Sequence, residues 1–198
     1  GDGQADWPIG WQTAQEIPGV GEGWEFYGGG GHTGDGYVYS GAGDNGTVNS
    51  DWLISPKYSV VDGDMFIFYA SDDGGSSIYP DIMTVHVSPA SGSDFLDFTV
   101  ELDNVTNMGT SWLPYSYDLS AYAGTEIRVA IVYRGEYGYG LNIDDVAAPE
   151  VYGEQGPLMY DYPSSLDFSY GGATNVGDSD TLIFDYFNIG GSALEISE

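Results

Sequence analysis

The sequence has no cysteine and only two histidines among its 198 residues. Disulfide bonds and thiolate chemistry are therefore excluded, although export is not, because many exported bacterial domains lack disulfides. Zinc is disfavoured, because its usual ligands are cysteine and histidine, and His32 and His86 do not form one of the short-spaced ligand pairs. We expect no zinc site.

Lys and Arg are scarce as well. Three basic residues face 31 Asp and Glu residues, which gives a formal net charge of -28 at pH 7. A protein that grips phosphates needs stripes of Lys and Arg, so a nucleic-acid partner is excluded, and an anionic membrane surface is repelled in the same way. The crowded carboxylates call for counter-ions, salt or a bound divalent metal.

Long apolar runs are also missing. No stretch approaches the roughly 20 apolar residues with which a helix crosses a bilayer, so we expect no membrane span. Apolar residues still make up 41% of the chain, and aromatic residues make up 15%. Because disordered acidic chains lack aromatic residues, this composition predicts a folded protein with a core.

Helix signals are few, whereas short runs typical of strands recur along the chain. Gly accounts for 31 residues, and no long segment repeats apolar residues at helical spacing. Apolar and β-branched runs lie at 65–70, 83–87, 98–102, 127–133 and 141–143. Loops rich in Gly, Asp and Ser separate them, at 27–35, 41–51, 71–81 and 90–97. This spacing predicts an all-β, antiparallel β-sandwich.

A domain boundary is predicted where Pro, Gly and Glu interrupt the strand pattern. We assign residues 1–148 to a first domain, 149–157 to a linker and 158–198 to a second domain. Strand-like runs at 166–168, 181–186 and 193–196 give the second domain an immunoglobulin-like character. Such a domain needs about 100 residues, so we expect a partial immunoglobulin-like β-sandwich at the C-terminus.

No group of residues in the sequence points to catalysis. A nucleophilic mechanism needs a Ser or Cys beside a His that an acid orients, but His32 sits in a Gly-rich loop and His86 in a predicted strand. Carboxylate pairs are abundant by chance in so acidic a chain, and nothing sets the pKa of one member apart from the other. We therefore predict no catalytic residues and no enzyme activity.

Calcium is the ion that the acidic loops favour, because it takes six to eight oxygen ligands and tolerates irregular geometry. Asp72 and Asp73 end one predicted strand and Asp81 begins the next, so a hairpin there can bring three carboxylates to one cation. Asp144 and Asp145 close the last strand of the first domain and can face the N-terminal segment. Further oxygen ligands are offered by Asp51, Asp2, Gln4 and Asp6. The alternative for each aspartate is an ordinary solvated turn.

Four segments occur in a fixed order along the first domain. They are 7–11 followed by 21–24, 50–56 (Ser-Asp-Trp-Leu-Ile-Ser-Pro), 69–73 leading through 81–88, and Trp112 with 117–124 and then 138–146. Together they resemble the cleaved-adhesin or choice-of-anchor J family, the MAM-like domains of gingipain haemagglutinin regions. Segments 166–168 and 188–194 are similar to Hydin-like, choice-of-anchor D immunoglobulin-type repeats.

The first resemblance implies a jelly-roll β-sandwich over residues 7–147, with calcium at such positions as Asp72, Asp73, Asp81 and Asp144. Family members usually begin with an acidic-aromatic strand, and only residues 1–6 precede the first segment here, so we expect that strand to be missing or shortened. The resemblance also places four tryptophans in the core, namely Trp11, Trp24, Trp52 and Trp112.

Aromatic residues in Gly-rich segments are candidates for stacking on sugar rings. Tyr137 and Tyr139, which alternate with glycines, are the favoured platform, although Tyr139 can equally pack as a strand residue. Trp24 and Tyr37 are further candidates, and for Trp24 a place in the core is the stronger alternative.

The sequence thus predicts a calcium-stabilised adhesion or binding module of a bacterial secreted or surface protein, located outside the cell. Its expected partner is a glycan, a matrix or surface protein, or a second copy of itself. One alternative is a carbohydrate-binding accessory module of a secreted hydrolase or protease. Another is a strand-exchanging subunit of an extracellular filament, because sheet edges left open by missing strands can pair with donated ones.

Overall fold

The computed structural model describes residues 8, 10–34, 36–43, 46–74, 79, 81–106, 108–152, 159–162 and 185–188. The chain divides into two compact units, Gly1–Tyr152 and Gly153–Glu198. Residues 1–7, on which the expectation of a shortened first strand rests, lie outside the described residues. No helix in the described part is long and apolar enough to cross a membrane.

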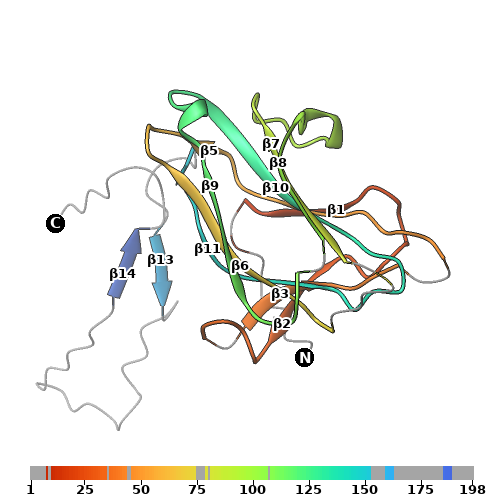
Figure 1. Ribbon diagram of the computed structural model, residues 1–198. Coiled ribbons are helices and arrows are strands. Elements are labelled where there is room, and N and C mark those ends of the chain that lie inside the picture. Colours follow the sequence, from red (N-terminus) through yellow and green to blue (C-terminus); the bar gives the residue numbers. More distant parts are fainter. Residues whose placement is uncertain are drawn as a thin grey trace, which may run out of the picture. The chain divides into compact units, whose positions relative to one another are not determined.

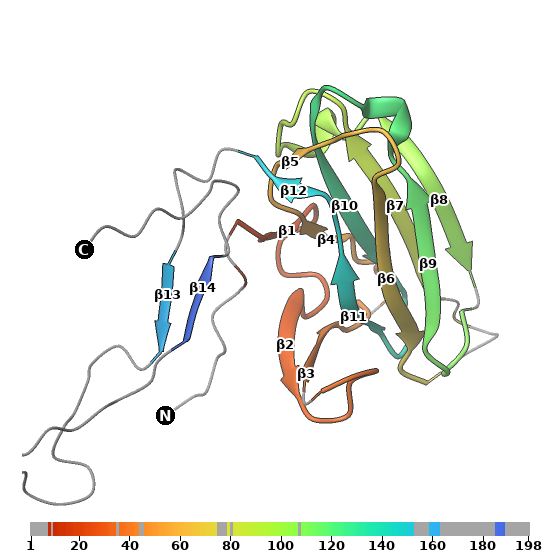
Figure 2. The ribbon, with the colours of Figure 1, turned by 90° about the vertical axis from the view of Figure 1, so that its left-hand side faces the viewer.

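The first unit contains two antiparallel sheets, which Figures 1 and 2 show as stacked layers. The larger, seven-stranded sheet consists of β1 (Gln12–Gln15), β4 (Asp51–Ile54), β5 (Tyr58–Ser59), β7 (Ile82–Ser88), β8 (Val100–Thr106), β10 (Glu126–Arg134) and β12 (Glu150–Val151). Strand β10 is central, because it pairs with β4 and β5 along one edge and with β7 along the other.

The smaller, five-stranded sheet has the order β2, β3, β11, β6, β9. Its strands are β2 (Trp24–Gly28), β3 (Gly36–Ser40), β6 (Met65–Asp72), β9 (Leu113–Asp118) and β11 (Leu141–Ala147). Two single 3₁₀ turns, η1 (Phe95–Asp97) and η2 (Ser120–Tyr122), complete the described elements of this unit. The predicted all-β, antiparallel β-sandwich is therefore confirmed.

The core fills the space between the two sheets. Ile127, Val129 and Ile131 of β10 are fully buried there, against Phe66 and Phe68 of β6. Burying each such side chain contributes about 1.5–3 kcal/mol. This layer fixes which face of each sheet points inward, and so leaves the other face of the five-stranded sheet free to carry a site.

A second, smaller apolar cluster covers the opposite face of the seven-stranded sheet. Trp52 packs there with Phe95 and Phe98 from the segment around η1, over Ala130 and Val132 of β10. Strand β10 is thus buried on both faces, which explains why its sequence is almost continuously apolar instead of alternating.

The second unit contains one described pair of strands, β13 (Met159–Tyr162) and β14 (Asp185–Asn188), which pair antiparallel. The strand-like runs predicted at 166–168 and 193–196 lie outside the described residues. Strand β12 falls within the stretch predicted as a linker, yet it pairs with β5, so the first unit extends to Tyr152.

Candidate functional site

The outer face of the five-stranded sheet carries aromatic side chains. In β3, Val38 packs against the core, so strand alternation places Tyr37 and Tyr39 on the outer face. In β6, Tyr69 alternates with fully buried neighbours and lies outside for the same reason. Tyr27 of the edge strand β2 pairs with Tyr37. These residues come from strands that are distant in the sequence, and the sheet brings them together.

The rings of Tyr27, Tyr37, Trp112, His32 and Tyr69 form a continuous series, which we call the aromatic row. Tyr27 stacks on Tyr37 with ring centroids 5.6 Å apart, and Tyr37 meets Trp112 edge-on at 5.9 Å. Trp112 lies 6.2 Å from His32, which stacks on Tyr69 at 3.7 Å and an interplanar angle of 13°. The row therefore runs from β2 to β6 across β11, the strand between β3 and β6.

Two carboxylates of β11 hold the loop between β2 and β3 on this face. Asp144 Oδ2 accepts a hydrogen bond from the Thr33 amide at 3.2 Å. Asp145 accepts hydrogen bonds from the Thr33 hydroxyl at 2.5 Å and from His32 Nδ1 at 2.7 Å. The bond from Thr33 lowers the pKa of Asp145 most, and the bond from His32 lowers it further. Asp145 has a φ of 50°, and the register between β11 and β6 shifts after Asp144. A local irregularity of the strand thus accompanies the anchoring of the loop.

Removing the Asp144 carboxylate should loosen this loop. We expect Asp144→Ala to speed hydrogen exchange of the Thr33 amide about tenfold, because a hydrogen bond to a charged acceptor contributes about 1.5 kcal/mol. Amide exchange followed by mass spectrometry or NMR measures the effect. Asp62→Ala, which removes an exposed aspartate from a different turn, is the matched control. Equal protection of Thr33 in both variants would contradict the anchoring role.

Asp72 and Asp81 form a buried pair of carboxyl groups, with exposed fractions of 3% and 0%. Asp81 accepts hydrogen bonds from the Tyr133 hydroxyl and from the Tyr139 amide, the latter at 3.2 Å. Asp72 accepts from the Gly74 amide at 2.9 Å. Burial, and further the neighbouring Asp72, raise the pKa of Asp81. Because Asp72 lies close enough to Asp81 to raise its pKa, the pair favours a bound proton or cation over two bare charges.

The predicted hairpin around this pair requires a correction. Strands β6 and β7 do not pair, because β6 lies in the five-stranded sheet and β7 in the seven-stranded sheet, so Asp72 and Asp81 meet where the chain crosses between the sheets. Asp73 is exposed. Within the described part of the chain, no three His, Asp or Glu side chains come together as a metal site. Two carboxylates therefore converge where the sequence led us to expect three.

Asp51, another predicted calcium ligand, is buried with its oxygens already occupied. Oδ1 accepts from Gln15 Nε2 at 3.0 Å, and Oδ2 accepts from the Ser40 hydroxyl at 2.9 Å and from Asn49 Nδ2 at 2.5 Å. This arrangement fixes the segment before β4. Asp144 and Asp145 bind the β2–β3 loop, and the partners expected for them, Asp2, Gln4 and Asp6, lie outside the described residues.

Among the aromatic residues predicted to bind a ligand, Tyr37 lies in the aromatic row, and Tyr137 and Tyr139 are exposed. Tyr137 packs edge-on against Tyr79 at 5.4 Å and has a φ of 54°, which is uncommon for a residue with a side chain. The Tyr39 hydroxyl donates to the Tyr139 carbonyl at 2.9 Å, which joins this loop to the edge of the row.

Trp24 lies in the core, as the resemblance implied, whereas Trp112 does not. Trp24 is only 5% exposed and donates from Nε1 to the Asp51 carbonyl at 3.0 Å, so it is a core residue and cannot stack on a ligand. Trp112, expected in the core, lies in the aromatic row. Sequence reasoning also missed His32 and Tyr69 as members of the row. For Tyr69 the alternation of residues 65–70 was a usable signal, since it assigns that ring to the face opposite the core.

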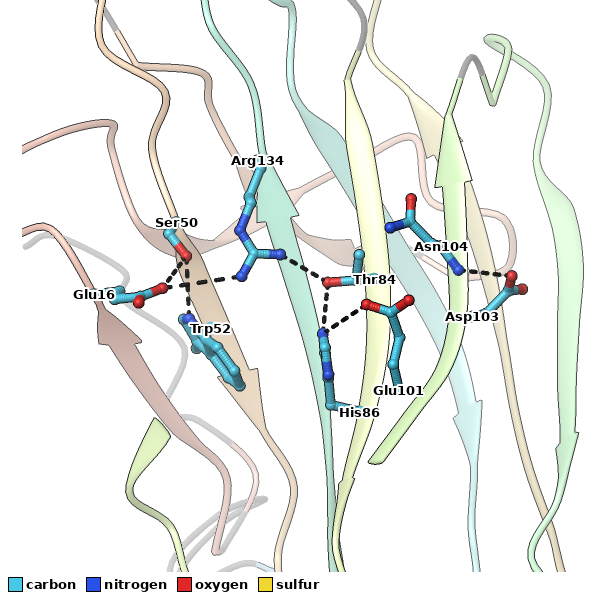
Figure 3. Close-up of polar contacts among 9 residues, drawn as sticks. All are labelled: Glu16, Ser50, Trp52, Thr84, His86, Glu101, Asp103, Asn104 and Arg134. Atoms are coloured by element: carbon cyan, nitrogen blue, oxygen red, sulfur yellow. Dashed lines mark hydrogen bonds and ion pairs between the residues drawn. The ribbon is translucent and has the colours of Figure 1, made fainter. Parts of the chain in front are cut away.

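The outer face of the seven-stranded sheet carries a polar network around His86 (Figure 3). His86 Nε2 lies 2.9 Å from the Thr84 hydroxyl and 4.0 Å from Glu101, and Arg134 donates to the same hydroxyl at 3.0 Å. A nucleophile–base–acid relay needs the nucleophile and the acid on opposite ring nitrogens, but here both approach Nε2. Burial lowers the pKa of His86, and its ring stacks on Trp52 at 5.6 Å. This network ties neighbouring strands together and does not form a triad.

Comparison with known proteins gives no match in sequence to any family model or curated protein. The fold is similar to that of the K1 cleaved adhesin domain of Lys-gingipain from Porphyromonas gingivalis W83, with a TM-score of 0.57 and 22% identity over 72% of this chain and 92% of that one. For the K3 cleaved adhesin domain of the same protein the TM-score is 0.57, with 17% identity over 70% and 91%.

A third solved structure, described as carbohydrate-binding modules of promiscuous specificity from the β-sandwich superfamily, gives a TM-score of 0.51 and 13% identity over 71% of this chain and 57% of that one. At these identities the likeness concerns the fold. The chain has a β-sandwich fold that it shares with cleaved adhesin domains and with carbohydrate-binding modules.

Proposed function

We propose that this chain is a glycan-binding adhesion module of a bacterial secreted or surface protein, and that the glycan binds along the aromatic row. The observation that carries the proposal is the row itself, five rings in succession with centroid distances of 3.7 to 6.2 Å on the outer face of one sheet. Aromatic rings present flat apolar faces with polar edges, which suits the alternating C–H and hydroxyl surface of a sugar chain. The module binds and does not catalyse.

The position of the row supports a ligand-binding role over a packing role. Tyr27 is 52% exposed, and the row lies on the sheet face opposite the core, which already buries its own aromatic rings such as Phe66 and Phe68. Contiguous exposed aromatic surface mostly marks a site of interaction. Strands carry Tyr27, Tyr37 and Tyr69, and hydrogen bonds to Asp144 and Asp145 hold the loop that carries His32, so little ordering is needed on binding.

We also propose that a calcium ion stabilises the module at Asp72 and Asp81. Carboxylate oxygens are the ligands that calcium prefers, and the basic side chains of the chain are engaged elsewhere. Lys57 forms an ion pair with Glu126 at 3.2 Å. Arg128 donates hydrogen bonds to the carbonyls of Ser55 at 2.7 Å and Ser91 at 3.1 Å. Arg134 donates to the Thr84 hydroxyl at 3.0 Å. A cation bound at the two buried carboxylates would offset their negative charge. Two carboxylates provide part of a calcium shell, with water or main-chain carbonyls to complete it.

Binding to a panel of soluble polysaccharides tests the glycan proposal. We expect at least one polysaccharide to bind, and Tyr37→Ala and Trp112→Ala each to weaken that binding roughly 2- to 10-fold, because one aromatic contact contributes about 0.5–1.5 kcal/mol. Affinity electrophoresis or calorimetry measures the change. Tyr152→Ala, which removes an exposed tyrosine outside the row, is the control. Flat titrations across the panel, or equal binding by all three variants, would refute the proposal.

A further inference from the structure

We propose that the aromatic row selects glycans that carry free amino groups, such as oligomers of glucosamine, over N-acetylated and acidic glycans. This inference rests on the proposed function and adds the chemical class of the ligand. It follows from the charges beside the row, from the location of the basic side chains, and from an unpaired acceptor within the same face.

The charged side chains beside the row are carboxylates. Asp144 and Asp145 lie next to His32, and they accept hydrogen bonds from His32 and Thr33 of the β2–β3 loop. Glu25 of β2 pairs in register with Tyr39, so strand alternation places it on the outer face next to Tyr27 and Tyr37. Burial raises the pKa of Tyr37 and of Tyr39, and the nearby charge of Asp73 raises both further, as does that of Glu22 for Tyr39. Carboxylates thus lie at both ends of the row.

No basic side chain offsets this charge. The three Lys and Arg residues of the sequence all belong to the seven-stranded sheet or its flanking segments, where they bind the partners described above. His32, the base within the row, already donates to Asp145. A face of aromatic rings surrounded by carboxylates attracts cations through both the ring faces and the charges, and repels anions.

Asn142 adds a hydrogen-bond acceptor to this face. It lies in β11, in register with Tyr39 on one side and Ser71 on the other, and it is only 6% exposed. Its Nδ2 donates to the Ser71 hydroxyl at 3.2 Å, whereas its Oδ1 is buried without a hydrogen-bond partner among the residues that the structure describes. Buried acceptors are normally satisfied, so this oxygen calls for a donor. An ammonium group offers three donors and no acceptor.

The row favours an amino sugar over a basic peptide. Its rings lie in succession across adjacent strands, which matches a chain of flat sugar rings, each with an apolar face to stack and an amino group to meet a carboxylate. A Lys side chain brings the charge without the flat face. The experiment below includes a basic peptide, so that this alternative has its own outcome.

The test uses the full chain and four hexamers at about pH 6, where amines are protonated. The hexamers are of glucosamine, N-acetylglucosamine, galacturonic acid and lysine. We expect the glucosamine hexamer to bind at least about tenfold more tightly than the N-acetylated one, the galacturonic acid hexamer not to bind, and the advantage of the amine to shrink as salt rises. Glu25→Gln and Asp73→Asn should each reduce that advantage, with Asp62→Asn as the control for net charge.

Non-specific attraction to so acidic a protein is controlled by Tyr37→Ala and Trp112→Ala, which leave the net charge unchanged and should still weaken glucosamine binding. Equal affinity for the amine and the N-acetylated hexamer would overturn this inference and leave the proposed function standing. Tighter binding of the lysine hexamer than of the glucosamine hexamer would overturn it in favour of a basic peptide. Failure of every glycan, in this set and in the polysaccharide panel, would remove the proposed function together with the inference.

Discussion

Asp51→Ala is expected to lower the free energy of unfolding by about 3 kcal/mol, in calcium and in chelator alike. The substitution leaves the buried donors of Ser40 and Asn49, and the partly buried donor of Gln15, without the oxygens that now accept from them. Asn49 and Gln15 keep second acceptors in the Gly41 and Val20 carbonyls. The loss therefore falls mostly on the Ser40 hydroxyl, with a smaller share from the hydrogen bonds that the Gln15 and Asn49 amides donate to Asp51.

Urea unfolding followed by tryptophan fluorescence measures this loss. Asp62→Ala, the exposed counterpart, should change the free energy of unfolding by less than about 0.5 kcal/mol. Measurements with and without calcium distinguish a structural carboxylate from a metal ligand. If Asp51 bound calcium, the loss of unfolding free energy on its substitution would be larger in calcium than in chelator. A loss that disappears in chelator would return Asp51 to the calcium site that the sequence suggested.

Four of the five strand-like runs predicted in the first domain fall on well-buried strands, whereas the run at 98–102 overlaps the partly exposed β8 (Val100–Thr106). The apolar runs at 65–70, 83–87, 127–133 and 141–143 correspond to β6, β7, β10 and β11, which line the space between the sheets. Strands with a smaller apolar share were missed, among them β1 (Gln12–Gln15) and β9 (Leu113–Asp118), which carry many exposed residues at the margins of the sheets. A strand that contributes little to the core carries little of the apolar pattern from which strands are predicted.

The candidate site was only partly predictable, because it depends on the register between strands that are distant in the sequence. Tyr37 was identified from its Gly-rich surroundings, but nothing local indicates that it meets Trp112. Likewise, nothing local indicates that Asn142 lies on this face, which follows only from the pairing of β11 with β3 and β6. Residue composition predicted a surface rich in aromatic and acidic side chains. Which of those side chains lie on the same face depends on how the strands pair.

The tryptophans show the same limit. Trp24 begins β2 opposite Ser40, on the parity of the core-facing Val38, and this places its ring inside. Trp112 precedes β9, the strand at the edge of the five-stranded sheet, and its ring meets Tyr37 and His32 on the outer face. Both tryptophans belong to the framework motifs of the resemblance, so motif membership alone does not separate a core role from a surface role.

Calcium is expected to raise the melting temperature of the protein, and Asp81→Asn is expected to abolish that response. An ion that binds only the folded state at a hundredfold excess over its Kd adds about 2.7 kcal/mol, or roughly 5 to 10 °C for a chain of this size. Thermal melts in calcium and in chelator measure the shift. Asp73→Asn, in the exposed neighbour of Asp72, should retain most of the response. A melting temperature that is indifferent to chelator would remove the calcium assignment.

In chelator, Asp81→Asn should be at least as stable as the natural chain at neutral pH. The asparagine is uncharged and its amide can donate to Asp72, so the variant removes one of the two negative charges that the natural pair buries at neutral pH. A variant that is several kcal/mol less stable in chelator would show that the charge of Asp81 itself supports the fold.

The pH dependence of this pair follows from the direction of the pKa shift. Burial and Asp72 raise the pKa of Asp81 in the folded state above the unfolded value of about 3.9. The folded state therefore binds the proton more tightly, and the stability that this proton provides is complete below about pH 4 and is lost as pH rises through the folded pKa. In chelator, the natural chain should lose this contribution on going from acid to neutral pH, whereas Asp81→Asn should not. Because calcium needs the deprotonated carboxylate, proton and calcium compete for Asp81, and the stabilisation by calcium must weaken as pH falls and the proton binds again.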